Sequence, residues 1–262
     1  MNAPGWGRRS LVAAATLGAW AGWQAARVKR ARRRTDRTDR FRHVPEDPRH
    51  CVVVAGDSTA VGVGAGNPRL SVAGRLALAL RDARIVNVAH SGARLADVPH
   101  QLRRVFGLID ASLCVVLCGA NDVLRFTSPA RVRRNVRALI GLAQRADVPL
   151  VLVPPGHIGA APLWLPPLSW LLSWRARGVR RALFRAAHKQ SGVEVVDLVL
   201  PARQDPFRAA PAAHYAADGL HPNANGYGQW FEQLVQQSRA VQHRLPPARR
   251  APRVQLAHRL FR

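Results

Sequence analysis

Val52-Val53-Val54-Ala55-Gly56-Asp57-Ser58-Thr59 is an apolar run that stops abruptly at a Gly-Asp-Ser turn. Its β-branched residues lack polar alternation, which is typical of a parallel strand buried on both faces. The turn places Ser58 at the carboxyl end of that strand. Ligands of open α/β sheets bind beyond the carboxyl ends of the strands, so this serine is a candidate functional residue.

Similar apolar runs recur along the chain and alternate with helical patterns. We predict strands at 51–55, 84–89, 113–118, 149–154 and 193–198. We predict helices at about 70–82, 94–106, 129–146, 174–191 and 222–240. This alternation implies right-handed βαβ crossovers and a mostly parallel, doubly wound sheet, so the predicted fold class is α/β.

The composition fits a globular domain that carries an unusual charge. The 262 residues are 48% hydrophobic, which excludes disorder throughout, and the formal net charge is +25. Much of this charge lies in two blocks: Arg27, Lys29, Arg30, Arg32, Arg33, Arg34, Arg37, Arg40 and Arg42, and then Arg239, Arg244, Arg249, Arg250, Arg253, Arg259 and Arg262. Such blocks attract anionic membranes or nucleic acid without sequence preference, or remain solvated tails without a dedicated partner. We predict a membrane surface as partner, no specific nucleic acid and no protein partner.

Leu11 to Ala26 form a mainly apolar segment before the first arginine block. As a helix it would span ~24 Å, short of the ~30 Å hydrocarbon core, which makes it a marginal transmembrane candidate. Ala19-Trp20-Ala21 offers the alternative of a signal-peptide cleavage site. Positive charge directly after the segment resists translocation, so we predict a single membrane anchor, with a charge bias that favours a cytoplasmic catalytic side.

The chain divides into three predicted parts. Residues 1–50 hold the anchor-like or signal-like segment and a basic linker, 51–240 form the globular domain, and 241–262 form a basic tail. Its cysteines are Cys51, Cys114 and Cys118, too few for a disulfide framework. No partner histidines occur at ligand spacing, so we predict no metal site and no cofactor.

Asp218 and His221 place a carboxylate and an imidazole three residues apart, close to the C-terminal end of the globular domain. Serine is a weak nucleophile until a base takes its proton, and that base needs a carboxylate to fix its tautomer. The spacing lets the Asp218 carboxylate meet Nδ1 of His221 while Nε2 faces a serine. Taken alone, Asp-x-x-His is more often a helix-capping turn.

Two further strand ends carry hydrogen-bond donors that a tetrahedral intermediate requires. Gly92 follows the second predicted strand and offers a backbone N–H, and Asn121 follows the third and offers a side-chain amide. The N–H of Ser58 would be the third donor. Each residue alone is more often a turn former, but four signals at four element ends favour a common site.

Gly56-Asp57-Ser58, Gly92, Gly119-x-Asn121-Asp122 and Asp218-x-x-His221 together resemble the four blocks of the SGNH (GDSL-type) hydrolase family. The resemblance covers about residues 51–238. It implies a three-layer α/β/α fold and metal-free hydrolysis of esters or thioesters. It also implies that Ser58 is the nucleophile, His221 the base and Asp218 its orienting acid, with Ser58, Gly92 and Asn121 as the oxyanion hole.

Other residues of these motifs and of the chain after Ser58 have no predicted part in catalysis. Thr59 departs from the usual Leu or Ile of the family, but its side chain is not a reacting group. Asp57 and Asp122 belong to the motifs, and we predict structural roles for both. Gly62-x-Gly64-x-Gly66 lacks the spacing and the lysine of a phosphate loop, so a turn that gives access to Ser58 explains these glycines better.

The segment 162–174 is unusually apolar for a connection and contains Trp164 and Trp170. It follows the fourth predicted strand, so we predict that these tryptophans bind substrate, as an acyl-binding wall or as a lid that touches the membrane. The alternative is a buried helix start that packs on the core.

The sequence thus predicts a membrane-associated serine esterase that cleaves small acyl esters, lipid-like ones among them, through an acyl-enzyme intermediate. A thioesterase or a lysophospholipase is the close alternative. A basic membrane-binding or nucleic-acid-binding module on a hydrolase-like scaffold is the alternative from another class. The complete set of triad and donor residues favours the enzyme.

Overall fold

The computed structural model describes residues 6–35 and 38–246, and within this part five strands form one parallel sheet. The strands are β1 (His50–Gly56), β2 (Ala83–Asn87), β3 (Leu113–Leu117), β4 (Leu150–Val153) and β5 (Val193–Val195). Their spatial order is β2-β1-β3-β4-β5. In the register of the sheet Val54 pairs with Asn87 on one side and with Val115 on the other. The strand order reverses beside β1, which places the end of β1 at the topological switch point.

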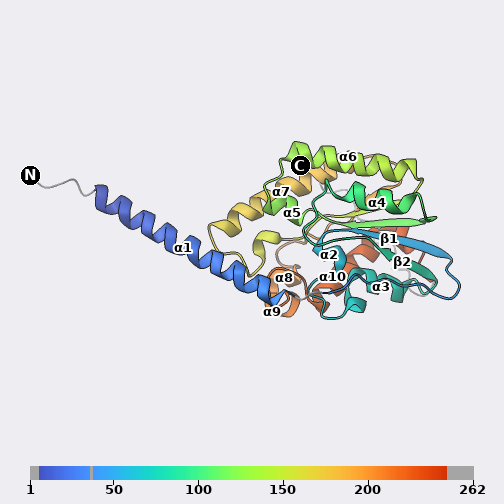
Figure 1. Cartoon of the computed structure of the whole chain (residues 1–262), viewed down its shortest axis with the longest axis horizontal. Helices are drawn as coiled ribbons and strands as arrows, with labels where there is room; N and C mark the ends of the chain where they lie inside the picture. The colour runs from blue at the N-terminus through green and yellow to red at the C-terminus, as the bar shows by residue number, and fades with distance from the viewer. Residues whose placement is uncertain (1–5, 36–37, 247–262) are drawn as a thin grey trace, which may run out of the picture.

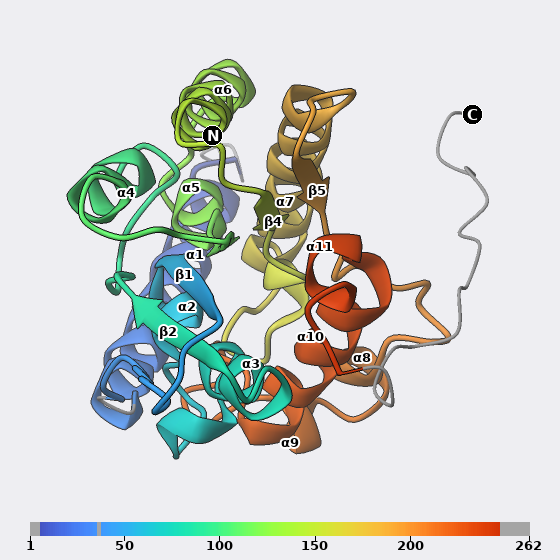
Figure 2. The same ribbon diagram turned by 90° about the vertical axis from the view of Figure 1, so that its right-hand side faces the viewer.

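Helices cover both faces of this sheet (Figure 2). One face carries α3 (Val72–Ala79), α10 (Ala224–Gln237) and α11 (Arg239–Gln242), and the other carries α4 (Val98–Phe106), α6 (Pro129–Arg145) and α7 (Leu168–Ala187). Successive residues of β1 point to opposite faces, so Val52 and Val54 pack in the first layer and Val53 and Ala55 in the second. The predicted α/β fold with a doubly wound parallel sheet in three layers is confirmed.

Short helices occupy the connections between these elements. They are α2 (Ser58–Val61), η1 (Pro68–Leu70), α5 (Ala120–Leu124), η2 (Ile158–Ala160), α8 (Pro206–Ala209) and α9 (Pro211–His214). Both α2 and α5 begin within three residues of a strand end. The motif residues at those ends therefore lie on rigid elements, a placement that suits a site of defined geometry.

Helix boundaries differ most from the prediction in α7, which begins at Leu168 and not at 174. Proline tolerates a helix start because it has no N–H to leave unpaired, and Pro167 occupies the N-cap. Leu172 in the first turns is buried, so packing draws this apolar stretch into the helix. At the other end of the domain α10 begins at Ala224 and not at Pro222, because the Asn223 side chain accepts hydrogen bonds from the N–H groups of Asn225 and Gly226.

The N-terminal helix α1 (Trp6–Arg34) projects from the body, and its last turns lie against it (Figure 1). Across residues 6–35 and 38–246, no helix combines the length and apolar character that a membrane crossing needs. The anchor predicted at Leu11–Ala26 is therefore not supported. Arginines flank this stretch on both sides, and Gln24 together with small alanines and glycines keeps its hydropathy low.

The connection from α1 to β1 is tied to the sheet, although its sequence is polar. His43 forms an isolated antiparallel bridge with Ile85 of β2, and Phe41 packs against the core. At the other end of the body Leu245 is buried in the same core cluster, so packed structure continues beyond residue 240. The predicted basic tail falls mostly on 247–262, which lie outside the described residues.

Candidate active site

Ser58 is the first residue of α2, immediately after β1. The side chain of Asp57 caps this helix by accepting hydrogen bonds from the N–H of Thr59 at 2.9 Å and from its hydroxyl at 2.7 Å. The N–H of Asp57 donates to the carbonyl of Leu117 at the end of β3. Ser58, the predicted nucleophile, thus stands on a sharp strand-to-helix turn that is tied to the neighbouring strand.

The loop from Asp218 to His221 brings the predicted base, His221, to this serine across 163 residues of chain. Nε2 of His221 lies 2.9 Å from Oγ of Ser58, and Nδ1 of His221 lies 2.6 Å from Oδ2 of Asp218. The other carboxylate oxygen, Oδ1, accepts hydrogen bonds from the N–H groups of Leu220 at 2.9 Å and His221 at 3.0 Å. The three residues form a continuous hydrogen-bonded chain with the geometry of a catalytic triad.

The position of this loop depends on close contacts with a glycine turn. Gly64 has a φ of +90°, and a Cβ at this position would lie 2.6 Å from the carbonyl oxygen of Pro222 and 3.0 Å from Cβ of His221. Only glycine combines this conformation with such an approach. One of the glycines that follow Ser58, Gly64, thus permits the close approach of the His221 loop.

Burial and hydrogen bonding set the pKa values of three aspartates in or near the site. Burial alone would raise the pKa of Asp218, but the hydrogen bond and the charge of His221, with the N–H groups of Leu220 and His221, lower it overall. For Asp57 and Asp122 burial outweighs the hydrogen bonds and raises the pKa of each carboxyl. Asp218 is the carboxylate suited to stabilise a protonated imidazole, whereas Asp57 caps α2 and Asp122 accepts from the N–H of Leu95 at 2.9 Å.

The predicted oxyanion donors converge on the same place. Ser58, Gly92 and Asn121 all line the cavity that contains the Ser58–His221 pair. The N–H of Ser58 belongs to the first turn of α2, where helical N–H groups have no partner within the helix. The amide of Asn121 donates one hydrogen to the carbonyl of Ala93 at 3.0 Å, which orients the group and leaves its second hydrogen for a ligand.

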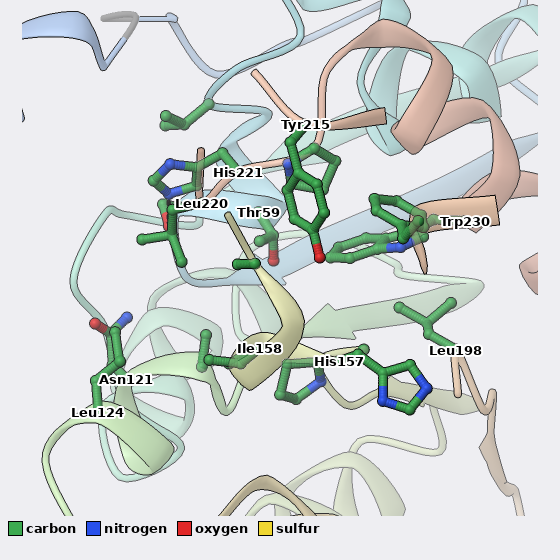
Figure 3. A pocket seen from close by; sticks show the side chains of 18 of the residues that line it. Thr59, Asn121, Leu124, His157, Ile158, Leu198, Tyr215, Leu220, His221 and Trp230 are labelled. Atoms are coloured by element: carbon green, nitrogen blue, oxygen red, sulfur yellow. Dashed lines mark hydrogen bonds between the residues drawn. The ribbon is translucent and has the colours of Figure 1, made fainter. Parts of the chain in front are cut away.

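The cavity beside the triad has a volume of about 250 Å³ and mainly apolar walls. Figure 3 shows His221 and Asn121 on one side, and Trp230 and Leu198 on the opposite side. Ile158 lies between these two sides (Figure 3). A mainly apolar cavity with a few polar groups, among them Ser58, Asn121 and His221, is the arrangement expected for an acyl group held beside a nucleophile.

The two tryptophans that the sequence singled out do not line this cavity. Trp164 is partly buried and packs against the core, and Trp170 on α7 is 69% exposed. The aromatic wall comes instead from Phe207, Tyr215 and Trp230. No local pattern marks these residues, because they reach the cavity from α8, α10 and the loop before His221.

The sequence also does not predict a polar cluster in the cavity wall. Nε2 of His157 lies 3.4 Å from Oδ2 of the buried Asp205, and Nε of Arg208 lies 3.5 Å from the same oxygen. Burial, followed by the charge of Arg208, lowers the pKa of His157. Among the described residues no three His, Cys, Asp or Glu side chains gather as a potential metal site.

Comparison with protein families matches residues 54–229 to the GDSL-like Lipase/Acylhydrolase family. This match covers more than half of the chain and includes every residue predicted for the triad and the oxyanion hole. The chain therefore belongs to this family of SGNH (GDSL-type) hydrolases. It is a carboxylic ester hydrolase.

Solved structures show the same fold at low sequence identity. LAE5, an α/β hydrolase from the metagenome of Lake Arreo, is 20% identical with a TM-score of 0.58, and the match covers 74% of this chain and 96% of that one. TesA is 20% identical with a TM-score of 0.57 over 71% and 96%. Axe2, an acetylxylan esterase from Geobacillus stearothermophilus, is 16% identical with a TM-score of 0.52 over 74% and 95%. Comparison with curated proteins found no match.

Proposed function

We propose that this protein is a serine esterase that works through the Ser58–His221–Asp218 triad and an acyl-enzyme intermediate. The observation that carries the proposal is the hydrogen-bonded chain from Oγ of Ser58 through the His221 ring to Asp218. In this geometry Nε2 accepts the serine proton as Oγ attacks the ester carbonyl. Asp218 holds the imidazole in the required tautomer and stabilises its protonated form.

The oxyanion of the tetrahedral intermediate would be held by the N–H groups of Ser58 and Gly92 and by the amide of Asn121. As the intermediate collapses, His221 gives its proton to the leaving alcohol, and the acyl group remains on Ser58. Water then attacks the acyl-enzyme while Nε2 of His221 accepts one of its protons. Collapse of the second intermediate releases the acid and returns the proton to Ser58.

Labelling by a fluorophosphonate probe tests this mechanism directly. The wild-type protein should be labelled and should hydrolyse a short-chain nitrophenyl ester, and Ser58→Ala should lose both activities while it keeps its melting temperature. A serine of ordinary reactivity would stay unlabelled. That result would instead favour a binding module on a hydrolase-like scaffold.

We propose a short acyl chain as the part of the substrate that enters the cavity. Its volume of about 250 Å³ lies just below the roughly 300–1,000 Å³ usual for sites of drug-sized ligands. The chain would extend from Ser58 towards Leu198 and Trp230. Trp230→Ala should enlarge this end and shift the preference of kcat/KM towards longer nitrophenyl esters; an unchanged profile would place the acyl chain elsewhere.

The same series settles the choice among related reactions. Nitrophenyl esters, acyl thioesters and lysophospholipids of equal chain length are compared at one enzyme concentration. Highest kcat/KM on the plain ester supports the esterase, and a thioester or lysophospholipid optimum supports one of the two alternatives. Because the triad attacks the carbonyl in every case, the leaving-group side of the cavity decides this preference.

We also propose that the protein associates peripherally with an anionic membrane surface and acts there on lipid-like esters that carry a short acyl chain. Three tryptophans support this: Trp23 on α1 is 57% exposed, and Trp170 and Trp174 at the start of α7 are 69% and 58% exposed. Leu168 of α7 lines one hollow together with residues of α1, so these segments lie side by side. Exposed tryptophans beside arginines are typical of proteins that rest in a lipid headgroup region.

Sedimentation with vesicles tests this association. Vesicles that contain phosphatidylserine should retain the protein more strongly than neutral vesicles, and Trp23→Ser with Trp170→Ser should weaken this retention. Trp164→Ser is the control, because Trp164 packs against the core. Equal retention by both vesicle types, or no effect of the double variant, would contradict the proposal.

A further inference from the structure

The last turn of α1 reaches the active site, although α1 lies outside the family match at residues 54–229. Thr35 directly follows this helix and lines the same cavity as Ser58 and His221. Its hydroxyl oxygen lies 3.2 Å from Oδ2 of Asp218. This contact joins residues 183 positions apart in the chain, so local sequence does not produce it.

The contact completes the hydrogen bonding of the catalytic carboxylate. Oδ1 of Asp218 accepts from the N–H groups of Leu220 and His221, and Oδ2 accepts from Nδ1 of His221. Thr35 supplies the fourth donor, on Oδ2. A carboxylate has about four lone-pair sites, and Asp218 is only 4% exposed, so water is a poor substitute for this hydroxyl.

The threonine hydroxyl has one proton and two acceptors within reach. The carbonyl oxygen of Ala31 lies 3.0 Å away and Oδ2 of Asp218 lies 3.2 Å away. Hydrogen bonds to an ionised acceptor are roughly twice as strong as those between neutral groups, so the carboxylate competes well for the proton. Hydrogen bonding lowers the pKa of Asp218, which keeps it ionised and able to accept.

Further contacts hold α1 in the position that delivers Thr35. Gln24 is 5% exposed and pairs with the chain at 163–165: Nε2 donates to the carbonyl of Leu163 at 3.1 Å, and Oε1 accepts from the N–H of Leu165 at 3.3 Å. Arg27 donates to the carbonyls of Pro162 at 2.5 Å and Leu163 at 3.3 Å.

The segment 162–165, which is hydrogen-bonded to α1, also contacts the loop from Asp218 to His221. The N–H of Leu163 donates to the carbonyl of Gly219 at 3.0 Å, directly after Asp218. The N-terminal helix is therefore linked to this loop twice, by a side chain at Asp218 and through the backbone at Gly219. In Figure 1 the last turns of α1 lie against the body at the side where α8 and α9 are found.

We infer that α1 is part of the catalytic apparatus and that Thr35 is a positioning residue, which holds the Asp218 carboxylate in the orientation that His221 requires. The inference rests on the proposed triad mechanism. Thr35 touches no reacting atom in this role and acts through Asp218. The segment outside the family match thus contributes a hydroxyl to the proposed triad, from the residue that follows α1.

Three single variants test the role. Thr35→Val removes the hydroxyl at nearly constant size, Thr35→Ser keeps it, and Thr16→Val removes a hydroxyl from the same helix at an exposed position away from Asp218. Thr35→Val should lower kcat roughly tenfold, as expected for the loss of a hydrogen bond to a charged group, with KM within about twofold of the wild type. Thr35→Ser and Thr16→Val should stay within about twofold of the wild-type kcat. Melting temperatures check that all variants fold.

A second measurement does not depend on turnover. Nuclear magnetic resonance follows the exchange of the His221 Nδ1 proton with water, which reports how firmly that proton is held against Oδ2 of Asp218. Exchange should be severalfold faster in Thr35→Val than in the other two variants or the wild type, because a loosely held carboxylate releases the proton more often.

The outcomes separate the two ideas. Wild-type activity with unchanged kcat and exchange in Thr35→Val would overturn the positioning role and leave the proposed function intact. A wild type that neither turns over esters nor reacts with fluorophosphonate would overturn the proposed function, while faster exchange in Thr35→Val would still support the contact. Loss of kcat in both Thr35→Val and Thr35→Ser would assign the effect to packing and would overturn the role of the hydroxyl.

Discussion

The two ends of the triad are held in different ways. Ser58 is fixed by its immediate neighbours: β1 leads into it, Asp57 caps the helix that follows, and the adjacent strand accepts the N–H of Asp57. The Asp218–His221 loop also has local hydrogen bonds, from the N–H groups of Leu220 and His221 to Oδ1 of Asp218. Its position beside Ser58, however, involves Thr35, Leu163 and Gly64, which come from distant parts of the chain.

This difference indicates which part of the active site distant substitutions should disturb. The turn at Ser58 is built from contacts within a few residues and from the buried sheet, so most distant substitutions should leave it in place. The base depends on three segments that must dock correctly. Changes far from the chemistry should therefore act mainly through His221, since small displacements of a catalytic group cost large factors in rate.

The largest expected effect comes from Asp218→Asn. The asparagine can still accept from the N–H groups of Leu220 and His221, but it no longer stabilises a protonated imidazole and favours the wrong tautomer. By analogy with serine proteases, kcat should fall by about 10⁴-fold. Steady-state hydrolysis of a nitrophenyl ester measures this effect. A loss of less than tenfold would mean that the carboxylate contributes little to the base.

Asn121→Ala should rank second, because it removes one oxyanion donor and leaves both ends of the triad in place. Loss of one such donor costs about 10²–10³ in kcat. The rate of fluorophosphonate labelling should fall with kcat, since that reaction also develops charge on an oxygen in the hole. Normal kcat in this variant would remove Asn121 from the oxyanion hole.

Gly64→Ala should break the catalytic loop while sparing the Ser58 turn. The new Cβ meets Pro222 and His221, in addition to the strain of a positive φ, and we expect the free energy of unfolding to drop by about 3 kcal/mol and kcat to fall. Gly66→Ala is the matched control: its φ is +71° but nothing lies within 4 Å of the added atom, so it should cost only about 1 kcal/mol. Urea unfolding and kcat measured on both variants test the difference. Equal effects of the two substitutions would contradict the close approach of Gly64 to Pro222 and His221.

The smallest expected effect concerns Asp57, which caps the helix that begins at Ser58. Burial raises the pKa of Asp57, so the folded protein retains a proton there that the unfolded chain loses near pH ~3.9. The stability that Asp57 contributes is present below this pH and is lost as the pH rises through the raised native pKa. Asp218 has a lowered pKa and stays ionised in this window.

Asp57→Asn removes this titration but keeps an oxygen that can accept from the N–H of Thr59. The free energy of unfolding should therefore decline less with rising pH above about 4 than it does in the wild type. Urea unfolding at several pH values measures the slope. Identical slopes in the two proteins would show that Asp57 does not titrate in this range.

Much of the fold could be predicted because its signals are local. The runs around 52–56 and 113–117 are uniformly apolar, and such runs mark buried parallel strands whatever surrounds them. The sequence does not predict the start of α7 at Leu168, because consecutive tryptophan and leucine residues suit a loop wall, a lid or a buried helix equally well. Packing of Leu172 decided between them.

The residues of the candidate site also fall into those that local sequence predicts and those that it does not. The sequence motifs pointed to Ser58, Gly92, Asn121, Asp218 and His221, all of which line the cavity or belong to the triad in the structure. The walls of the cavity were not predictable, since Trp230 and Leu198 carry no motif and arrive from separate elements. Thr35 was hidden for the same reason, because its segment is merely a polar linker in the sequence.

The amino-acid sequence by itself determined the class of fold and predicted the nucleophile and its chemical partners, because strand periodicity and short motifs act over a few residues. Only the tertiary structure decided which aromatic side chains form the cavity, and that the residue after the N-terminal helix contacts the Asp218 carboxylate. Those features depend on how distant segments pack, and packing is fixed by shape and hydrogen bonding across the whole fold.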